Sequence, residues 1–262
     1  MKLHSVTITG LDDDNDYEEV LKLSKQYPWL EWGVLFSDGR KGTPRYPSAE
    51  WITGLVERLK EFPVIGTRPR FAAHLCGKTM RDFVFQTKLD ETFSTRWLEG
   101  FGIDYMKFDI TFGRVQVNFS AQQEKFGTGT MHALSDGWYE SYSGNIITQH
   151  NVANHWVWEA MQQKETGAIR AHQILHDASG GRGIEPGTWN KPIAGVLNGY
   201  AGGINPSNVI TTLVELEKIV GDGYIWIDME GGVRDENGKM NMPAVHQMLK
   251  TIAMIGADRR WF

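Results

Sequence analysis

Short runs rich in β-branched and aromatic residues alternate along the chain with longer segments in which apolar residues recur every three or four positions. The alternation continues from end to end without a Ser/Pro-rich linker, and it is typical of βα units around a parallel sheet. The expected strands are Val6–Thr9, Trp32–Phe36, Phe71–Leu75, Val115–Phe119, Ile146–Gln149, Gln173–His176, Tyr200–Gly202 and Tyr224–Met229.

Amphipathic segments between these strands predict helices. The clearest are Asp16–Gln26, Ala49–Phe62, Asn154–Gln163, Ser207–Val220 and Pro243–Ile255. The long stretch between the third and fourth strands has room for more than one helix. Eight strands with intervening helices in 262 residues match the size of a (β/α)8 barrel, so we predict an α/β fold with a single barrel domain over residues 1–262. A doubly wound open sheet is the alternative, although Thr9–Asp12 is not the glycine-rich turn typical of that fold.

The composition narrows the choice of partner and compartment. The chain has 41% hydrophobic and 23% charged residues and a net charge of −5, without the basic runs that nucleic acid or an anionic membrane surface would need. Its one cysteine, Cys76, cannot form an internal disulfide. The first residues lack the apolar core of a signal peptide, and no apolar stretch is long enough to span a bilayer. We expect a cytoplasmic protein with a small-molecule partner.

In such a barrel, the chemistry is found where strands run into the loops that follow them. Polar residues stand at most of these junctions: Thr9, Asp12, Arg45, His74, Cys76, Gln116, Asn118, His150, Asp177, Asp228 and Glu230. Because side chains alternate between the faces of a strand, residues spaced two apart should point to the same side. Three pairs have this spacing: His74 with Cys76, Gln116 with Asn118, and Asp228 with Glu230.

Two glycine pairs stand at the ends of the last two strands. Gly202 and Gly203 precede an Asn-Pro pair suited to a helix start, and Gly231 and Gly232 follow the eighth strand. Glycine lets backbone N–H groups approach a ligand closely, and barrels often bind phosphate at these two loops. We therefore predict a phosphate site at the four glycines, with tight turns that bind nothing as the alternative.

A metal site is not expected. The eight histidines form no His-Glu-x-x-His pattern, and the acidic run Asp12–Asp16 lacks the glycine and the terminal glutamate of a calcium loop. This run is better interpreted as an acidic helix start.

Several motifs follow one another along the chain: Gly33–Phe36 with Thr43–Ser48, Val115–Asn118, His176–Asp177 with the glycine-rich Ser179–Gly183 and Trp189, Ala201–Val209, and Asp228–Arg234. In order and spacing they are similar to the G-F-V-F, S-P-R-Y-V-S, V-Q-L-H, L-D, G-G-T-G, D-W, A-G-G-L-x-P-x-N-V and D-V-S-S-G-V-E elements of phosphoribosylanthranilate isomerases. The chain therefore resembles that family over most of its length, with residues 38–42 as an insert.

The resemblance implies a barrel enzyme that binds a phosphoribosyl compound and isomerises it by proton transfer, without a cofactor. It implies that Asp177 is the general acid and that Arg45 helps to hold the substrate. Thr9 stands where the family has its catalytic cysteine, and a threonine hydroxyl is too weakly acidic to serve as the base alone. Cys76 is the candidate replacement, with its thiolate favoured by a neighbouring cation such as Lys78 or Arg81, and a buried structural thiol is the alternative.

The remaining polar residues at the strand ends are expected to bind the substrate: Gln116, Asn118, His150, Asp228 and Glu230. Two other functions stay open. One is a phosphosugar-binding or nucleotide-binding protein that has lost turnover, as the threonine at position 9 permits. The other is a glycoside hydrolase that uses Asp177 and Glu230 as its two carboxyl groups.

Overall fold

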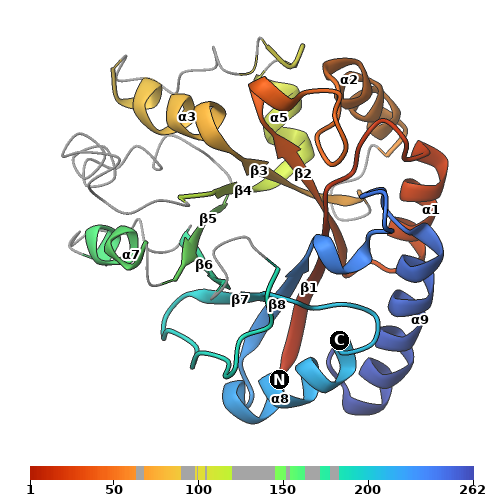
Figure 1. Cartoon of the computed structure of the whole chain (residues 1–262), viewed down its shortest axis with the longest axis vertical. Helices are drawn as coiled ribbons and strands as arrows, with labels where there is room; N and C mark the ends of the chain where they lie inside the picture. Colours follow the sequence, from red (N-terminus) through yellow and green to blue (C-terminus); the bar gives the residue numbers. More distant parts are fainter. Residues whose placement is uncertain are drawn as a thin grey trace.

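Eight parallel strands pair in the order of the chain and close into a barrel (Figure 1). The structure, a computed structural model, describes residues 1–62, 68–89, 98, 100–103, 105–119, 145–151, 154–162, 172–177 and 183–262. The strands are β1 Lys2–Thr9, β2 Leu30–Phe36, β3 Arg70–Leu75, β4 Phe112–Val117, β5 Asn145–His150, β6 His172–Asp177, β7 Leu197–Ala201 and β8 Tyr224–Met229. The predicted α/β barrel is confirmed, and the open-sheet alternative is wrong.

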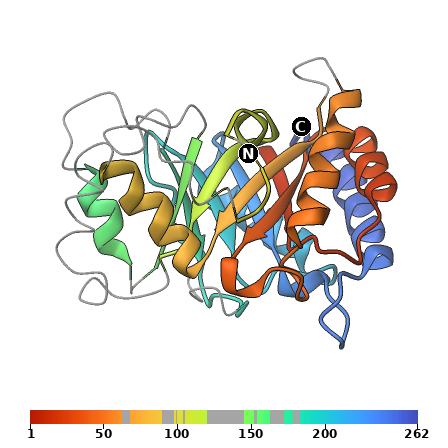
Figure 2. The ribbon, with the colours of Figure 1, turned by 90° about the horizontal axis from the view of Figure 1, so that it is seen from above.

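Helices cover the outside of the barrel (Figure 2). They are α1 Tyr17–Gln26, α2 Ala49–Arg58, α3 Gly77–Leu89, α5 Tyr105–Thr111, α7 His155–Gln162, α8 Val209–Val220 and α9 Met242–Arg259, with the short 3-10 turns η1 Asp38–Arg40, η2 Leu59–Glu61 and η6 Gly231–Val233. The stretch between the third and fourth strands holds α3 and α5, as its length predicted. Side chains cap two helices at the expected starts, because Asp16 accepts from the Glu18 N–H and Ser48 from the Trp51 N–H.

The segment between β7 and α8 differs from the sequence prediction. The strand begins three residues earlier than expected, at Leu197, and the helix begins at Val209 instead of Ser207. Asn205 and Asn208 both donate side-chain N–H groups to the Gly203 carbonyl at 3.0 Å. Such local side-chain bonds compete with helix formation and keep these residues in a turn.

Apolar side chains fill the space between the strands and the helices. Trp32 and Phe36, both fully buried on β2, belong to this core. The indole of Trp32 donates to the Ser24 hydroxyl on α1 at 2.9 Å. Phe36 meets the Phe108 ring edge-on at 5.9 Å between centroids. These contacts fix the outer face of the barrel and leave the inner face to other side chains.

The inside of the barrel is strongly polar. Arg114 on β4 donates Nε to Glu31 Oε2 at 2.9 Å and Nη1 to Gln173 Oε1 at 2.9 Å. Thr7 donates its hydroxyl to Glu31 Oε1 at 2.9 Å. Burial opposes ionisation of Glu31, but the Arg114 guanidinium outweighs it and lowers the pKa of that carboxyl. The guanidinium also stacks 4.5 Å from the Trp226 ring centroid, so this network fills the barrel below the strand ends.

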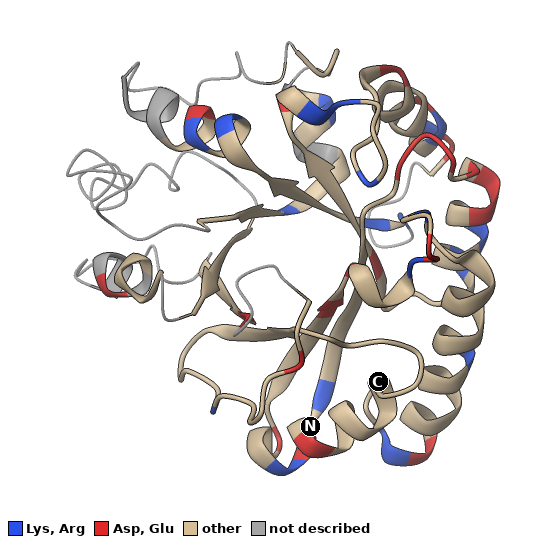
Figure 3. Cartoon of the chain, viewed as in Figure 1, with Lys and Arg blue, Asp and Glu red and all other residues tan. Residues whose placement is uncertain are grey.

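Charged residues of both signs lie over the outer helices (Figure 3). Within the described residues, no helix is long and apolar enough to cross a bilayer.

Candidate functional site

The carboxyl ends of the strands surround an open cavity of about 730 Å³. Eleven of the thirteen residues that the sequence assigns to catalysis or binding line it: Arg45, Cys76, Gln116, Asn118, Asp177, Gly202, Gly203, Asp228, Glu230, Gly231 and Gly232. Thr9 and His150 are the two that do not. The three pairs spaced two residues apart all face the cavity, as strand alternation predicted.

Asp228 is a buried carboxyl group on the cavity wall, at the end of β8 and 7% exposed. Thr9, on the neighbouring strand β1, donates its hydroxyl to Asp228 Oδ1 at 2.7 Å. Burial raises the pKa of Asp228 to about 7, even though the Thr9 hydrogen bond acts to lower it. The negative charges of Glu31 and Asp177 add to this rise, and the positive charge of Arg114 opposes it.

Asp177 is a second buried carboxyl group that lines the cavity. It ends β6, is 3% exposed, and receives the Gln149 side-chain amide at 3.5 Å from Oδ2. In the sheet register Asp177 lies beside Ala201 of β7, which lies beside Asp228. The two aspartates therefore stand at one level of the barrel, two strand spacings or about 10 Å apart along the wall.

Cys76 lies in the cavity but does not fit the predicted role of a thiolate base. Burial raises the pKa of the Cys76 thiol to about 11, although a hydrogen bond from Asn118 opposes the rise. Lys78, the cation expected to favour the thiolate, forms its ion pair with Asp82. A thiol with this pKa stays protonated at neutral pH, which disfavours Cys76 as the base.

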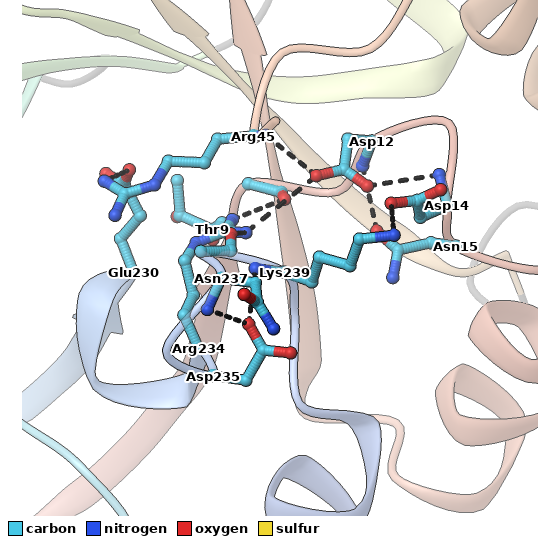
Figure 4. Close-up of polar contacts among 12 residues, drawn as sticks. Thr9, Asp12, Asp14, Asn15, Arg45, Glu230, Arg234, Asp235, Asn237 and Lys239 are labelled. Atoms are coloured by element: carbon cyan, nitrogen blue, oxygen red, sulfur yellow. Dashed lines mark hydrogen bonds and ion pairs between the residues drawn. The ribbon is translucent and has the colours of Figure 1, made fainter. Parts of the chain in front are cut away.

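Arg45 forms an ion pair with Glu230 across the rim of the cavity, 3.0 Å from Nη1 to Oε1 (Figure 4). The backbone of Arg45 has a φ of +77°, a left-handed conformation that is uncommon outside glycine. Its N–H donates to Asp12 Oδ2 at 2.8 Å, which holds the turn in that conformation. Arg45, which the resemblance assigns to substrate binding, is thus also the partner that neutralises Glu230.

Arg234 lies close to this ion pair, but its guanidinium bonds to backbone carbonyl groups (Figure 4). Its guanidinium donates to the carbonyl of Gly10 at 2.5 Å and to that of Gly238 at 2.9 Å. Arg234 thereby joins the loop after β8 to the end of β1, below Glu230.

The four glycines line the cavity beside one another. In the described part of the chain, none of their backbone N–H groups donates a hydrogen bond to another loop or side chain. Gly202 and Gly203 have positive φ values of +123° and +64°. A Cβ on Gly203 would lie 2.5 Å from the Glu185 backbone nitrogen, and one on Gly232 would lie 2.0 Å from the Ile204 carbonyl oxygen. Close loop packing therefore requires glycine at these positions, and the N–H groups are available in addition.

His150 does not reach the cavity, contrary to the sequence prediction. Strand β5 extends one residue further than expected, so alternation turns His150 to the face opposite Gln149. The His150 ring lies against His155 of α7, with 2.7 Å between Nε2 and Nδ1. Burial lowers the pKa of His150 to about 4, so the imidazole is neutral. His150 is thus not among the residues that line this cavity, and its assignment to substrate binding stays a prediction.

Arg40, Tyr46 and Gln149 are among the cavity residues that were not assigned a role from the sequence. Arg40 belongs to the insert of residues 38–42, and its guanidinium stacks 5.4 Å from the Tyr46 ring centroid. The position of Gln149 at the end of a predicted strand was the sequence feature that could have indicated its place in the cavity. In the glycine-rich Ser179–Gly183 motif only Gly183 is within the described residues, and it lines the cavity.

The described ranges contain no group of three or more His, Cys, Asp or Glu side chains arranged to hold a metal ion. His74, on the cavity wall, is kept neutral because burial lowers its pKa to about 4.

No protein-family model and no curated protein sequence matches this chain. The phosphoribosyl anthranilate isomerase of Thermus thermophilus is similar in structure, with a TM-score of 0.55 and 14% identity over 97% of this chain and 100% of that chain. Spore coat polysaccharide biosynthesis protein E of Chromobacterium violaceum has a TM-score of 0.49 and 10% identity, over 98% of this chain and 76% of that chain. At such identities the likeness is one of fold.

Proposed function

We propose that this chain is an enzyme that binds a phosphorylated, sugar-like small molecule in the mouth of its barrel and isomerises it by proton transfer, without a cofactor. The observation that carries the proposal is the state of Asp228. It is a buried carboxyl group on the cavity wall whose pKa is raised to about 7. Carboxyl groups perturbed in this way by burial in a cleft are typical of acid-base catalysts.

A pKa near 7 suits proton transfer at neutral pH. A group that is about half ionised can accept a proton from one atom and return it to another without a large energetic mismatch. An ordinary aspartate, with a pKa near 3.9, would be a much weaker base. We therefore assign Asp228 to the role of base, which the sequence had left to Cys76.

Asp177 keeps the role of general acid that the sequence resemblance implies. In the proposed reaction, Asp177 gives a proton to the ring oxygen of the sugar as the ring opens. Asp228 removes the proton from the carbon next to the anomeric carbon, and the electron pair of that C–H bond forms a double bond to the anomeric carbon as the bond to the ring oxygen breaks. Asp228 then gives the proton it took to the anomeric carbon of the enol, and the enol hydroxyl proton passes to Asp177, which restores both carboxyl groups. Thr9 is a positioning residue, because its hydroxyl bonds to Asp228 Oδ1 and it does not line the cavity.

The glycine turns support a phosphate group on the substrate. The four glycines line the cavity and their N–H groups donate to no other described loop, so we expect these groups to bind an anion. Glu230 stands next to these turns, and its repulsion of a phosphate is reduced by the ion pair with Arg45. The likeness to the isomerase in motif order and in fold is consistent with a phosphoribosyl compound as the substrate class.

Hydrogen–deuterium exchange at carbon tests the proposal directly. The protein is incubated in D2O with phosphoribosylanthranilate or ribose 5-phosphate, and deuterium at the sugar carbons is followed by NMR. We expect exchange by the wild-type protein and a loss of about 100-fold or more in Asp228→Asn. Asp222→Asn, an exposed aspartate before the same strand, is the matched control and should exchange normally.

The outcomes separate the alternatives. Phosphate binding without carbon exchange would favour the binding protein that has lost turnover. Equal exchange in the wild-type protein and Asp228→Asn would overturn the assignment of the base. The glycoside hydrolase reading is less well supported, because Glu230 is a partly exposed rim residue engaged by Arg45 and the carboxyl group with the raised pKa is Asp228.

A further inference from the structure

Three polar side chains form a hydrogen-bonded relay along one wall of the cavity. Gln116 on β4 donates its side-chain Nε2 to Asn118 Oδ1 at 2.8 Å. Asn118 donates Nδ2 to Cys76 Sγ at 3.4 Å, and the Cys76 thiol points to the His74 carbonyl oxygen at 3.8 Å. The relay therefore joins the ends of β3 and β4 at the surface that faces the cavity.

The protonated thiol of Cys76 determines which side chain donates and which accepts at each step of this relay. Because Cys76 keeps its proton and turns it to a backbone carbonyl, the sulfur lone pairs remain for the Asn118 amide. The Asn118 carbonyl oxygen then faces Gln116, and it must receive an N–H group from that residue. The orientation of the Gln116 amide is thus fixed, with its own oxygen as the free end.

That free end is an acceptor without a donor. Gln116 is 2% exposed, and among the described residues no group donates a hydrogen bond to its Oε1 atom. A buried carbonyl oxygen without a donor is costly, so native proteins rarely leave one unpaired. Gln116 lines the cavity, which makes a bound molecule the natural source of the missing donor.

We propose that Gln116 is a specificity residue whose Oε1 accepts a hydrogen bond from a hydroxyl group of the substrate, and that Asn118 and Cys76 hold it in that orientation. The proposal rests on the sugar-like substrate of the proposed function and names one feature of it. A ligand with a hydroxyl at this wall is favoured. A ligand that presents only a carbonyl oxygen there meets another acceptor and is disfavoured.

Titration calorimetry with four probes tests the inference: inorganic phosphate, n-pentyl phosphate, ribose and ribose 5-phosphate. The measured quantity is the ratio of the affinities for ribose 5-phosphate and n-pentyl phosphate. A net hydrogen bond corresponds to about a 5- to 10-fold preference, so Gln116→Leu should reduce the wild-type ratio by that factor. Its affinity for inorganic phosphate should stay within about twofold of the wild-type value. Gln26→Leu, the same change on α1, is the control and should keep the wild-type ratio.

The relay is tested at Asn118. Asn118→Leu removes the acceptor that orients Gln116 and should lose most of the preference. Asn118→Asp keeps an oxygen for the Gln116 amide and should keep the ratio, even where its added charge weakens the affinities for the three phosphate-containing probes. A purely structural role for Asn118 would not separate these two variants.

Two results would overturn the inference. One is an equal ratio in the wild-type protein and Gln116→Leu, and the other is an absence of binding by both ribose and ribose 5-phosphate. Binding of ribose that depends on Gln116, without binding of inorganic phosphate, would leave this inference in place while the phosphate site of the proposed function fails. If Gln116→Leu does not fold, the NMR signals of the glutamine side-chain amides in the wild-type protein decide. The pair of N–H signals from one glutamine must shift when ribose 5-phosphate is added and must not shift when n-pentyl phosphate is added.

Discussion

Replacing Thr9 by valine removes the hydroxyl that donates to Asp228 and leaves the size of the side chain almost unchanged. The donor lies 2.7 Å from Oδ1, and both residues are buried, at 2% and 7% exposure. Thr9 is also tightly packed, because a Cβ on Gly33 would lie 2.1 Å from its Oγ1 atom. A methyl group can occupy that space, but it cannot stabilise the negative charge of the carboxylate.

The size of the effect follows from the strength of that bond. A hydrogen bond to a charged group contributes about 1.5–3 kcal/mol, and one pKa unit corresponds to about 1.4 kcal/mol. The hydrogen bond from Thr9 lowers the pKa of Asp228, which burial has raised to about 7. Its loss should therefore raise the pKa by about 1–2 units. At pH 7 the ionised fraction of Asp228 would fall from about one half to between one tenth and one hundredth.

The pH dependence of carbon exchange measures this shift. For Thr9→Val we expect exchange at pH 7 to fall about 5- to 50-fold and to recover toward the wild-type rate near pH 9. The carbon-13 signal of the Asp228 carboxyl, assigned by its absence in Asp228→Asn, reports the same pKa without a substrate. Thr7→Val is the matched control on the same strand, because the Thr7 hydroxyl donates to Glu31. An unchanged or lowered pKa of Asp228 in Thr9→Val would refute the reasoning.

Three further changes test the electrostatics of the barrel. The pKa of Asp228 is raised from 3.8 to about 7. Between about pH 4 and 7 the folded protein therefore holds a proton on Asp228 that the unfolded chain releases. The free energy of unfolding falls as the pH rises through this window. Asp228→Asn should therefore raise the melting temperature by at least ~2 °C at pH 8 and change it little near pH 4, as followed by circular dichroism. Glu31→Gln leaves the Arg114 guanidinium buried without its ion-pair partner, and it should lower the free energy of unfolding measured in urea by about 3–5 kcal/mol. Replacing both residues by methionine should recover part of that loss. Arg45→Gln breaks a partly exposed ion pair and should change the free energy of unfolding by less than about 1 kcal/mol. It should nevertheless lower the affinity for inorganic phosphate, measured by calorimetry, about threefold. Adding Glu230→Gln should restore that affinity.

The barrel and most of its mouth could be predicted because both follow from local patterns. Alternating strands and amphipathic helices define a (β/α)8 barrel, and that fold brings all the strand ends to one face. Polar residues at strand ends were therefore gathered around one cavity without knowledge of any contact between them. Strand alternation also gave the correct side for the pairs on β3, β4 and β8.

The features of the site that the sequence did not predict depend on strand register and on burial. His150 was expected in a loop, and one added residue of strand turned it away from the cavity. The raised pKa of Asp228 depends on desolvation inside the closed barrel and on Thr9, which is 219 positions distant in the chain. The thiol of Cys76 likewise took its pKa from burial and not from the lysine two residues away. Local sequence carries no measure of desolvation, so acid-base roles are the least predictable part of such a site.

The pairing of Thr9 with Asp228 gives a physical account of how a barrel can use threonine where similar isomerases have a catalytic cysteine. β1 and β8 are neighbours in the closed sheet, so the proposed base has moved by one strand, or about 5 Å. The Thr9 hydroxyl donates to the carboxylate of Asp228, which is the base of the proposed function. Asp228 then faces Asp177 from two strands away instead of three. Both carboxyl groups line one cavity and the charge of Asp177 acts on Asp228, so a small ring bound between them would contact both groups, which is what the proposed isomerisation requires.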